Sequence, residues 1–304
     1  MGVDLFFVLS GFLITGVLLN AKDYSLRGYF AKFYARRARR ILPPYLLTLL
    51  AVSIVFGVAW SRHWYFYILF TNLLDPLHIP HPLAFSPLWS LAVEEQFYLV
   101  WPFAVYFLSE RRLAKLAACL IVVAPMLRGF VHFRDYQPVY TLTPFRMDLL
   151  AVGALLCLAY RHMPAQIERV GPKLGFLFGF SGVAGLLILE HNGISTGMNT
   201  RTGNVWIYEC TLFVSLGVML WALSGRYVGA LQWRPLTYIG KISYTMYLVH
   251  RGVLELCTTH LDKRAAAIAG LAITIGYASI SWYLMERNLL VHDRKVKTFA
   301  SATA

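Results

Sequence analysis

Charged residues are scarce in this 304-residue sequence, and acidic residues are scarcer than basic ones. Charged side chains make up 14% of the chain and hydrophobic ones 58%, with 15 Asp and Glu against 28 Lys and Arg. Soluble domains carry roughly a quarter charged residues, so the sequence has too little charge for a water-facing surface of this size. Lipid must cover much of that surface, which excludes an ordinary soluble globular protein.

Motifs for metals, nucleotides and disulfides are also missing. The sequence has no P-loop and no dinucleotide-binding fingerprint. His63, His78 and His81 share one loop without a carboxylate or cysteine pattern, so solvated side chains fit them better than a metal site. The four cysteines lie in apolar stretches without a Cys-x-x-Cys pair: Cys119, Cys157, Cys210 and Cys257. We expect buried thiols, no disulfide framework, no metal and no bound cofactor.

Long apolar stretches dominate what is present. A helix needs roughly 20 mostly apolar residues to cross a bilayer, and nine stretches qualify: 3–20, 42–60, 89–108, 113–130, 143–160, 173–190, 204–224, 237–258 and 265–285. The predicted fold class is therefore all-α, a polytopic transmembrane helical bundle of about nine spans. Residues 64–77 are apolar but short, which indicates an interfacial or re-entrant helix. No linker or repeat divides the chain, so we expect one domain over 1–304.

Basic residues gather in alternate connections between these stretches. The poorer set carries 6 Lys and Arg, whereas the richer set carries 20 and comprises 22–40, 109–115, 161–173, 225–241 and the tail 286–304. The positive-inside rule places the richer set in the cytoplasm. We therefore attribute the net charge of +13 to topology in a lipid bilayer and not to nucleic-acid binding. Nine spans then leave the N-terminus outside.

Several ionisable side chains fall within the expected spans, where each costs roughly 2.5–3.5 kcal/mol on insertion scales. Such groups usually face the interior of a helical bundle and have a role. Arg146 and Asp148 are two residues apart, about 200° around a helix, and so should find different partners. No pattern of polar residues accompanies Glu209. The others are Asp4, Glu94, Glu95, His250 and Arg251.

Glu94 has polar neighbours at helical spacing. It lies one turn from Ser90 and from Tyr98, which predicts a small polar face. The structural alternative is a carboxylate near a helix start, favoured by the helix dipole. Spacing alone leaves both interpretations open for Glu94, whereas the structural one is favoured for Glu95.

Four arginines occupy five positions in Tyr34-Ala-Arg-Arg-Ala-Arg-Arg-Ile-Leu-Pro-Pro-Tyr45. One interpretation is a topology anchor on anionic lipid headgroups. The other is a phosphate site, because arginine binds phosphate bidentately and Arg37 and Arg40 share a helical face. Pro43 and Pro44 are expected to set a helix boundary here.

Ser243, Tyr247 and His250 lie on one face of the expected helix over 237–258. A lone histidine on an apolar helix is more often structural than catalytic. Hydroxyl groups one turn away support, modestly, an imidazole tuned for proton transfer.

Five segments together resemble the type-3 membrane acyltransferases, integral-membrane enzymes that O-acylate bacterial cell-surface glycans and other small acceptors. The segments are Gly2-Val-Asp-Leu-Phe-Phe-Val-Leu-Ser-Gly-Phe-Leu-Ile14, Arg36-Arg37…Arg40-Ile-Leu-Pro, Trp89-Ser-Leu…Glu94…Phe97-Tyr98, Phe145-Arg-Met-Asp148 and Ser243-Tyr…Tyr-Leu…His250. They follow the order of the family and cover nearly the whole chain.

The resemblance implies transfer of an acyl group, usually acetyl, from acyl-CoA to a hydroxyl of a glycan or other small acceptor. Acyl-CoA would be a co-substrate that approaches from the cytoplasm. The expected donor-binding residues are Arg36, Arg37 and Arg40, and the catalytic candidates are Glu94 and His250. A polar cavity would be shaped by Asp4, Ser90, Arg146, Asp148, Ser243 and Tyr247.

One departure from the family pattern bears on activity. Family members look like ten-span proteins whose first helix carries an arginine and the histidine usually assigned as catalytic. This sequence starts at what resembles their second helix, so we expect an N-terminally incomplete domain. Two alternatives stay open: a non-enzymatic transporter, since buried charges also suit transport, and an inactive, shortened relative.

Overall fold

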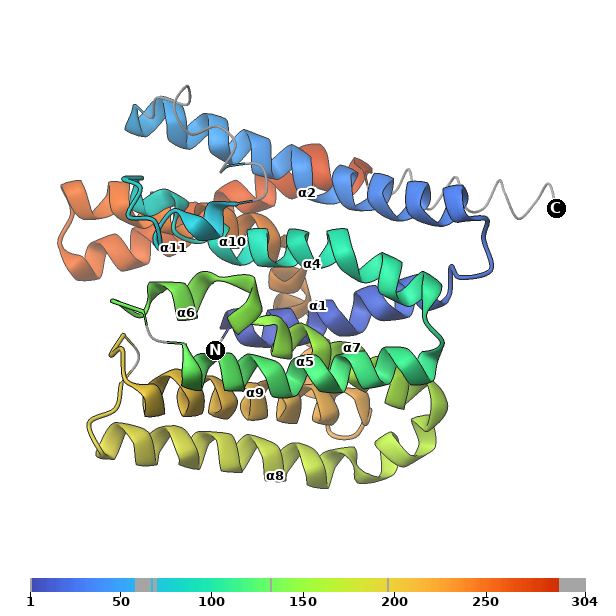
Figure 1. The fold of residues 1–304 in the computed structure, drawn as a ribbon. Helices are drawn as coiled ribbons and strands as arrows, with labels where there is room; N and C mark the ends of the chain where they lie inside the picture. Colours follow the sequence, from blue (N-terminus) through green and yellow to red (C-terminus); the bar gives the residue numbers. More distant parts are fainter. Residues whose placement is uncertain (1, 58–66, 68–69, 132, 196, 290–304) are drawn as a thin grey trace, which may run out of the picture. The chain divides into compact units, whose positions relative to one another are not determined.

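The computed structural model describes residues 2–57, 67, 70–131, 133–195 and 197–289, and the regular structure in these ranges is helical (Figure 1). Short 3-10 turns lie at η2 (Thr71–Leu73), η3 (Leu83–Phe85), η4 (Thr143–Phe145) and η5 (Gly229–Gln232), and a π-turn, η6, spans Trp282–Glu286. The α-helices are α1 (Gly2–Leu19), α2 (Leu26–Phe56), α4 (Leu88–Phe107), α5 (Glu110–Phe130), α6 (Gln137–Thr141), α7 (Met147–His162), α8 (Pro164–His191), α9 (Arg201–Leu223), α10 (Arg234–His260) and α11 (Lys263–Ser281).

Each of the nine stretches expected to span the membrane overlaps one of these helices, and the end of the stretch 42–60 lies outside the described residues. The prediction of a polytopic helical membrane protein is confirmed. Within the described residues, six helices are long and apolar enough to cross a bilayer: α1, α2, α5, α8, α9 and the segment Lys263–Leu289. The other three are α4, α7 and α10. These carry Glu94, Asp148 and His250, respectively, whereas Asp4 and the candidate arginines lie on α1 and α2.

Helix α2 corrects two expectations. Residues 26–40 are helical, although they were expected within a loop over 22–40, and Pro43 and Pro44 lie inside the helix instead of at its boundary. Ser25 caps the helix by accepting a hydrogen bond from the backbone of Gly28. Each proline lacks an N–H and removes one helical hydrogen bond. The intact turns on both sides keep the helix continuous, so the arginine cluster is carried on a helix.

Other expected loops are shorter than the charge pattern suggested, because α5, α8 and α10 begin inside them. The short helix expected over 64–77 lies partly outside the described residues, and its described part contains the 3-10 turn η2. Most of the expected tail over 286–304 also lies outside them.

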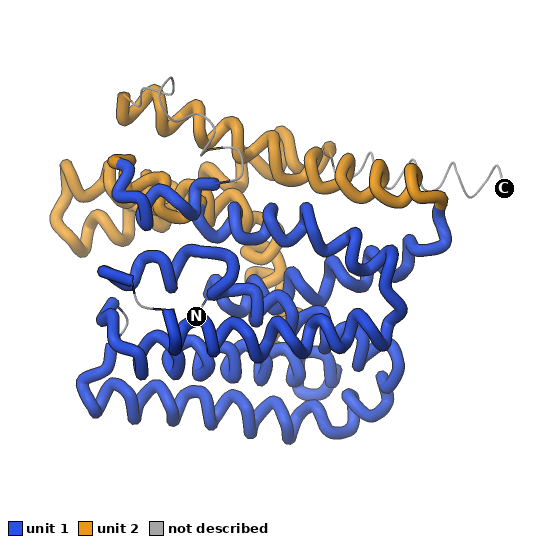
Figure 2. The backbone as a smooth tube through the Cα atoms, viewed as in Figure 1, with its two compact units in different colours: residues 1–24, 68–79, 89–228 blue, residues 25–67, 80–88, 229–304 orange. Residues whose placement is uncertain are grey.

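The chain forms two compact units (Figure 2). Unit 1 contains residues 1–24, 68–79 and 89–228, and unit 2 contains residues 25–67, 80–88 and 229–304. The single domain expected over 1–304 stays a prediction.

In unit 1, α1 packs closely on α7 through two glycines. A Cβ atom on Gly11 would lie 2.0 Å from the carbonyl oxygen of Leu150, and one on Gly153 would lie 2.0 Å from that of Val8. Small residues allow such close approach of helices in membranes, where van der Waals packing takes over from the hydrophobic effect. Any larger side chain at these two positions would force the helices apart.

In unit 2, α10 packs on α11 and contacts α2. The phenol of Tyr244 on α10 donates to the carbonyl of Ile41 on α2 (3.0 Å), and that of Tyr238 donates to Ser279 on α11 (2.8 Å). These bonds join α10, which carries Ser243, Tyr247 and His250, to both neighbouring helices.

Candidate active site

Unit 1 holds a buried ion pair between two expected site residues. Arg146 immediately precedes α7, and its Nη2 donates to Oδ1 of Asp4 on α1. The residues are 2% and 4% exposed, so the pair is shielded from water. Charge pairing in a low-dielectric interior is strong when the geometry is good. The pair therefore holds α1 and α7 in register as well as neutralising both charges.

Four aromatic rings surround the Arg146 guanidinium. Its central carbon lies 4.6 Å from the ring centroid of Tyr208, 5.7 Å from Trp89, 5.8 Å from Tyr140 and 5.9 Å from Phe7. Within about 6 Å such rings attract a cation through their negative faces. Burial raises the pKa of the Tyr140 phenol, which therefore stays neutral at physiological pH. Among the described residues, Nε and Nη1 of Arg146 have no hydrogen-bond partner, so the rings and Asp4 provide its surroundings.

A second buried arginine lies beside the first. Arg128, in the last turn of α5, is 1% exposed and donates to Oδ2 of Asp148 (2.6 Å) and to Oε1 of Glu209 (2.5 Å). It also donates to the carbonyl of Phe145 (2.5 Å). Its guanidinium lies 5.3 Å from the Tyr208 ring, which also packs on Arg146. Two arginines and three carboxylates thus share one polar core inside unit 1.

The expectation that Arg146 and Asp148 find different partners is confirmed: Asp4 pairs with the first and Arg128 with the second. Arg128 corrects the charge pattern, because it is one of the 6 basic residues counted in the poorer set of connections, in 128–142, and it instead lies buried in α5. Glu209, for which the sequence pattern offered no partner, pairs with Arg128. In the sequence, Arg128 and Glu209 could be recognised only as charged residues next to or within an apolar stretch. Their pairing joins residues 81 positions apart and therefore leaves no local sequence pattern.

Ser90 and Glu94 of α4 are also buried in unit 1, at 3% and 2% exposure. The same helix is anchored to α1 one and two turns further on. Ser10 and Tyr98 share a hydrogen bond, and Nε1 of Trp101 donates to Thr15 (2.9 Å). The buried polar face expected from the spacing of Glu94 and Tyr98 is therefore present, and its hydroxyl end contacts α1.

In unit 2 the three arginines expected to bind the donor make different contacts. Nε of Arg36 donates to the backbone of Lys32 one turn earlier (3.1 Å), and the Arg37 guanidinium lies 6.0 Å from the Phe33 ring. Arg40 lines a small cavity beside Arg39. The structure brings Arg40 to a cavity, whereas Arg36 and Arg37 have contacts along their own helix.

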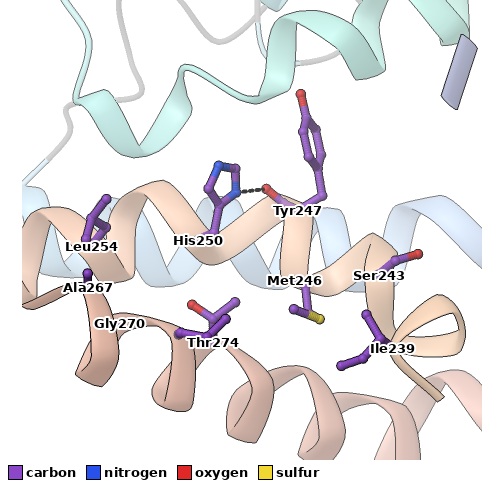
Figure 3. A pocket seen from close by; sticks show the side chains of 10 residues that line it. Ile239, Ser243, Met246, Tyr247, His250, Leu254, Ala267, Gly270 and Thr274 are labelled. Carbon is purple, nitrogen blue, oxygen red and sulfur yellow. Dashed lines mark hydrogen bonds between the residues drawn. The ribbon is translucent and has the colours of Figure 1, made fainter. Parts of the chain in front are cut away.

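The residues Ser243, Tyr247 and His250 line one groove of about 490 Å³ between α10 and α11 (Figure 3). Nδ1 of His250 hydrogen-bonds the carbonyl of Tyr247 (2.7 Å), and the Tyr247 phenol donates to the carbonyl of Pro87 (2.9 Å). Figure 3 shows the imidazole and the phenol on the same side of α10. The other lining residues are mostly apolar and include Ile239, Met246, Leu254, Ala267, Gly270, Leu271 and Thr274.

Within the described ranges, no group of three or more His, Cys, Asp and Glu side chains could hold a metal ion. All four cysteines are free thiols. Cys157, Cys210 and Cys257 are buried, as expected, but Cys119 is exposed. It lies two residues, about 200°, around α5 from the buried Ala117, on the opposite side of the helix.

These features define a polytopic helical membrane protein with a buried, ion-paired polar core in unit 1 and a basic, histidine-bearing region in unit 2. The family model described as an acyltransferase domain (type 3) matches residues 1–286, and the chain belongs to this family. The chain is 29% identical to YrhL of Bacillus subtilis over 85% of its length. It is 26% identical to the O-acetyltransferase OatA of Staphylococcus aureus over 86%, and 28% identical to the peptidoglycan O-acetyltransferase OatA of Listeria monocytogenes over 94%.

The chain spans about half the length of these relatives: 44% of YrhL, 47% of the S. aureus protein and 50% of the L. monocytogenes protein. No solved structure matches the chain significantly.

Proposed function

We propose that this protein is an integral-membrane O-acyltransferase that moves an acetyl group from acetyl-CoA to a hydroxyl of a peptidoglycan-type glycan. The observation that carries the proposal is the family match over residues 1–286, which includes every segment with a candidate site residue. The acceptor follows from the relatives, one of which is named a peptidoglycan O-acetyltransferase.

The reaction needs a base, an electrophile and stabilisation of a developing charge. The acceptor oxygen attacks the thioester carbonyl, its proton passes to a base, and the C–S bond breaks to release CoA thiolate, which then takes up a proton. Glu94 and His250 are the proposed proton carriers. The proposed polar surroundings are Asp4, Ser90, Arg146 and Asp148 within unit 1, and Ser243 and Tyr247 within unit 2.

Arg36, Arg37 and Arg40 are the proposed contacts of the donor phosphates, because guanidinium groups bind phosphate in a planar, bidentate way. The charge pattern supports a cytoplasmic position for this segment. We propose that the basic connections 22–40, 109–115, 161–173 and 225–241 and the tail 286–304 face the cytoplasm, with nine spans in this chain. The donor would then approach from the cytoplasm, where CoA thioesters are made.

Acetyl transfer by the purified chain in proteoliposomes tests this proposal. We expect Arg37→Ala and Glu94→Ala to lose most of the transfer, with Arg134→Ala, an exposed arginine of unit 1, as the control. Full transfer by both variants would refute the residue assignments. Transport of a substrate without consumption of acetyl-CoA would favour the transporter alternative.

A further inference from the structure

A groove of about 760 Å³ lies between α5 and α7 in unit 1. Each helix presents one face to the groove, because its lining residues recur at intervals of three or four positions. On α5 these residues are Glu110, Arg111 and Ala114, and on α7 they are Leu155, Leu158, Ala159 and His162. None of them is a residue proposed for acyl transfer, so the groove needs a separate explanation.

The groove is polar at one end and apolar along the rest. Helix α5 begins at Glu110 and α7 ends at His162, so the polar lining residues lie together at the helix ends. Leu155 precedes His162 by seven positions and is about 10 Å away along the α7 axis. Helix α5 is long and apolar enough to cross a bilayer. The polar end of the groove therefore falls at headgroup depth, and the apolar end points toward the hydrocarbon.

The carboxylate at the polar end is already paired within the protein. Oε2 of Glu110 hydrogen-bonds Nε2 of His162 (2.5 Å), and its Oε1 lies 3.5 Å from Nε of Arg161. Nη1 of Arg161 also donates to Oδ1 of Asn20 (2.8 Å), directly after α1. Glu110 is therefore neutralised by its neighbours and does not keep an anion out of the groove.

Arg111 is available to a ligand. It is exposed, and no described residue makes a hydrogen bond, ion pair or ring contact with its side chain. Ser109, which also lines the groove, accepts from the backbone N–H of Arg112 (3.4 Å). A hydroxyl that accepts in this way still has its own proton to donate. A free guanidinium beside a free hydroxyl donor suits a phosphate group.

The ligand that fits both halves of the groove is a phospholipid. Its phosphate would contact Arg111 and Ser109, and an acyl chain would follow the leucines of α7. A free phosphate has no apolar part for the rest of the groove. The ammonium of a zwitterionic headgroup would be repelled by Arg111 and Arg161, while Glu110, which would attract it, is already paired. Charge complementarity therefore favours a headgroup with a net negative charge, such as that of phosphatidylglycerol.

We propose that the groove binds one anionic phospholipid, with Arg111 and Ser109 on its phosphate and an acyl chain between α5 and α7. The same two helices are joined near their other ends by Arg128 and Asp148 (2.6 Å), so the lipid would join the helix pair at its opposite end. The proposal does not depend on acetyl transfer.

Native mass spectrometry of the full chain in detergent tests the proposal, with phosphatidylglycerol and phosphatidylethanolamine of equal chain length as probes. We expect the first phosphatidylglycerol to bind about fivefold more tightly, as for one net charge beside a cation at the membrane surface. Arg111→Ala should remove most of that ratio. Arg112→Ala, the matched control, deletes the same charge one position away and outside the groove, and should keep the ratio.

Two outcomes of this experiment would overturn the proposal. Equal affinity of the wild type for the two lipids would exclude selection of an anionic headgroup. An equal loss of the ratio in Arg111→Ala and Arg112→Ala would show only diffuse attraction of anionic lipid to a basic surface. Because Arg111 is exposed and without a described partner, its substitution should leave the fold intact.

The apolar half of the groove provides an independent test. Ala114→Leu fills space between α5 and α7, so phosphatidylglycerol should bind several-fold more weakly. Ala118→Leu, one turn further along α5 and outside the groove, is the control and should bind the lipid as the wild type does. Unchanged binding in Ala114→Leu would contradict an acyl chain in the groove. Displacement of the lipid by an equal concentration of inorganic phosphate would indicate a site for free phosphate and would also refute the proposal.

Thermal unfolding in the same detergent links the site to stability. A ligand that binds only the folded protein raises its Tm, so phosphatidylglycerol should raise the Tm of the wild type and of Arg112→Ala more than that of Arg111→Ala. An equal rise in all three proteins would contradict the proposal. Acetyl transfer is assayed on the same samples. Lipid selection without transfer supports the lipid site and counts against the proposed function, whereas transfer without lipid selection refutes the lipid site alone.

Discussion

The two units differ in the burial of the basic side chains at their candidate sites. In unit 1, Arg128 and Arg146 are almost fully buried, and both are paired with carboxylates. In unit 2, Arg40 and Lys241 are exposed at a cavity. Charges that leave water when the protein folds require fixed partners, whereas exposed charges stay hydrated until a ligand replaces the water. Substitutions at the buried ion pairs of unit 1 should therefore affect stability, whereas substitution of the exposed Arg40 in unit 2 should affect donor binding.

The largest effect is expected at Glu94. Glu94→Gln keeps the shape of the buried side chain but cannot take a proton, so kcat for acetyl transfer should fall roughly 10²–10⁴-fold, as when general base catalysis is lost. Steady-state kinetics with acetyl-CoA measure this. Glu95→Gln, its neighbour on α4, is the matched control and should stay within a few-fold of wild type. A kcat for Glu94→Gln within threefold of wild type would exclude Glu94 as the base.

Arg128→Leu should come next. Removal of the guanidinium leaves the buried Asp148 and the partly buried Glu209 without their cation, and breaking a buried pair costs about 3–5 kcal/mol in typical cases. Thermal unfolding of the protein in detergent should show a much lower Tm. Arg134→Leu, at an exposed position of unit 1, should leave the Tm nearly unchanged. Equal Tm values for the two variants would show that the buried pairs add little to stability.

A smaller loss is expected for Gly153→Ala. Its Cβ would lie 2.0 Å from the Val8 carbonyl oxygen, so α1 and α7 must separate, at a cost of about 1–3 kcal/mol. The Asp4–Arg146 pair bridges the same two helices and should weaken as well. Gly276→Ala on α11 has nothing within 4 Å of the added atom and is the control. Wild-type stability of Gly153→Ala would mean that the two helices are not packed this closely.

The smallest effect is expected in the groove of unit 2. Ala267→Leu narrows the groove near Leu254, so the KM for acetyl-CoA should rise a few-fold, roughly the effect of a kilocalorie, with little change in kcat. Ala272→Leu lies on the same helix outside the groove and should have no effect. A lower kcat with an unchanged KM would place the donor elsewhere.

The sequence predicted the helices well because a bilayer imposes a simple rule of length and polarity. It also predicted that Arg146 and Asp148 would have separate partners, because helical geometry fixes their angle. It did not predict the partners. Arg128 with Glu209 and Arg40 with Lys241 are brought together by helix packing, which a single sequence does not reveal. The expected helix boundary at Pro43 and Pro44 was wrong, because the rule that proline breaks a helix ignores the stable helical turns on either side.

The most direct test of the central claim is the fate of labelled acetyl-CoA. The purified chain in proteoliposomes is supplied with [¹⁴C]acetyl-CoA and soluble peptidoglycan fragments, and the glycan is recovered before and after mild alkali. An O-acetyltransferase predicts label in the glycan that alkali removes, one free CoA released for each acetyl group transferred, and loss of both with Glu94→Gln. Unlabelled glycan and unconsumed acetyl-CoA would contradict the account.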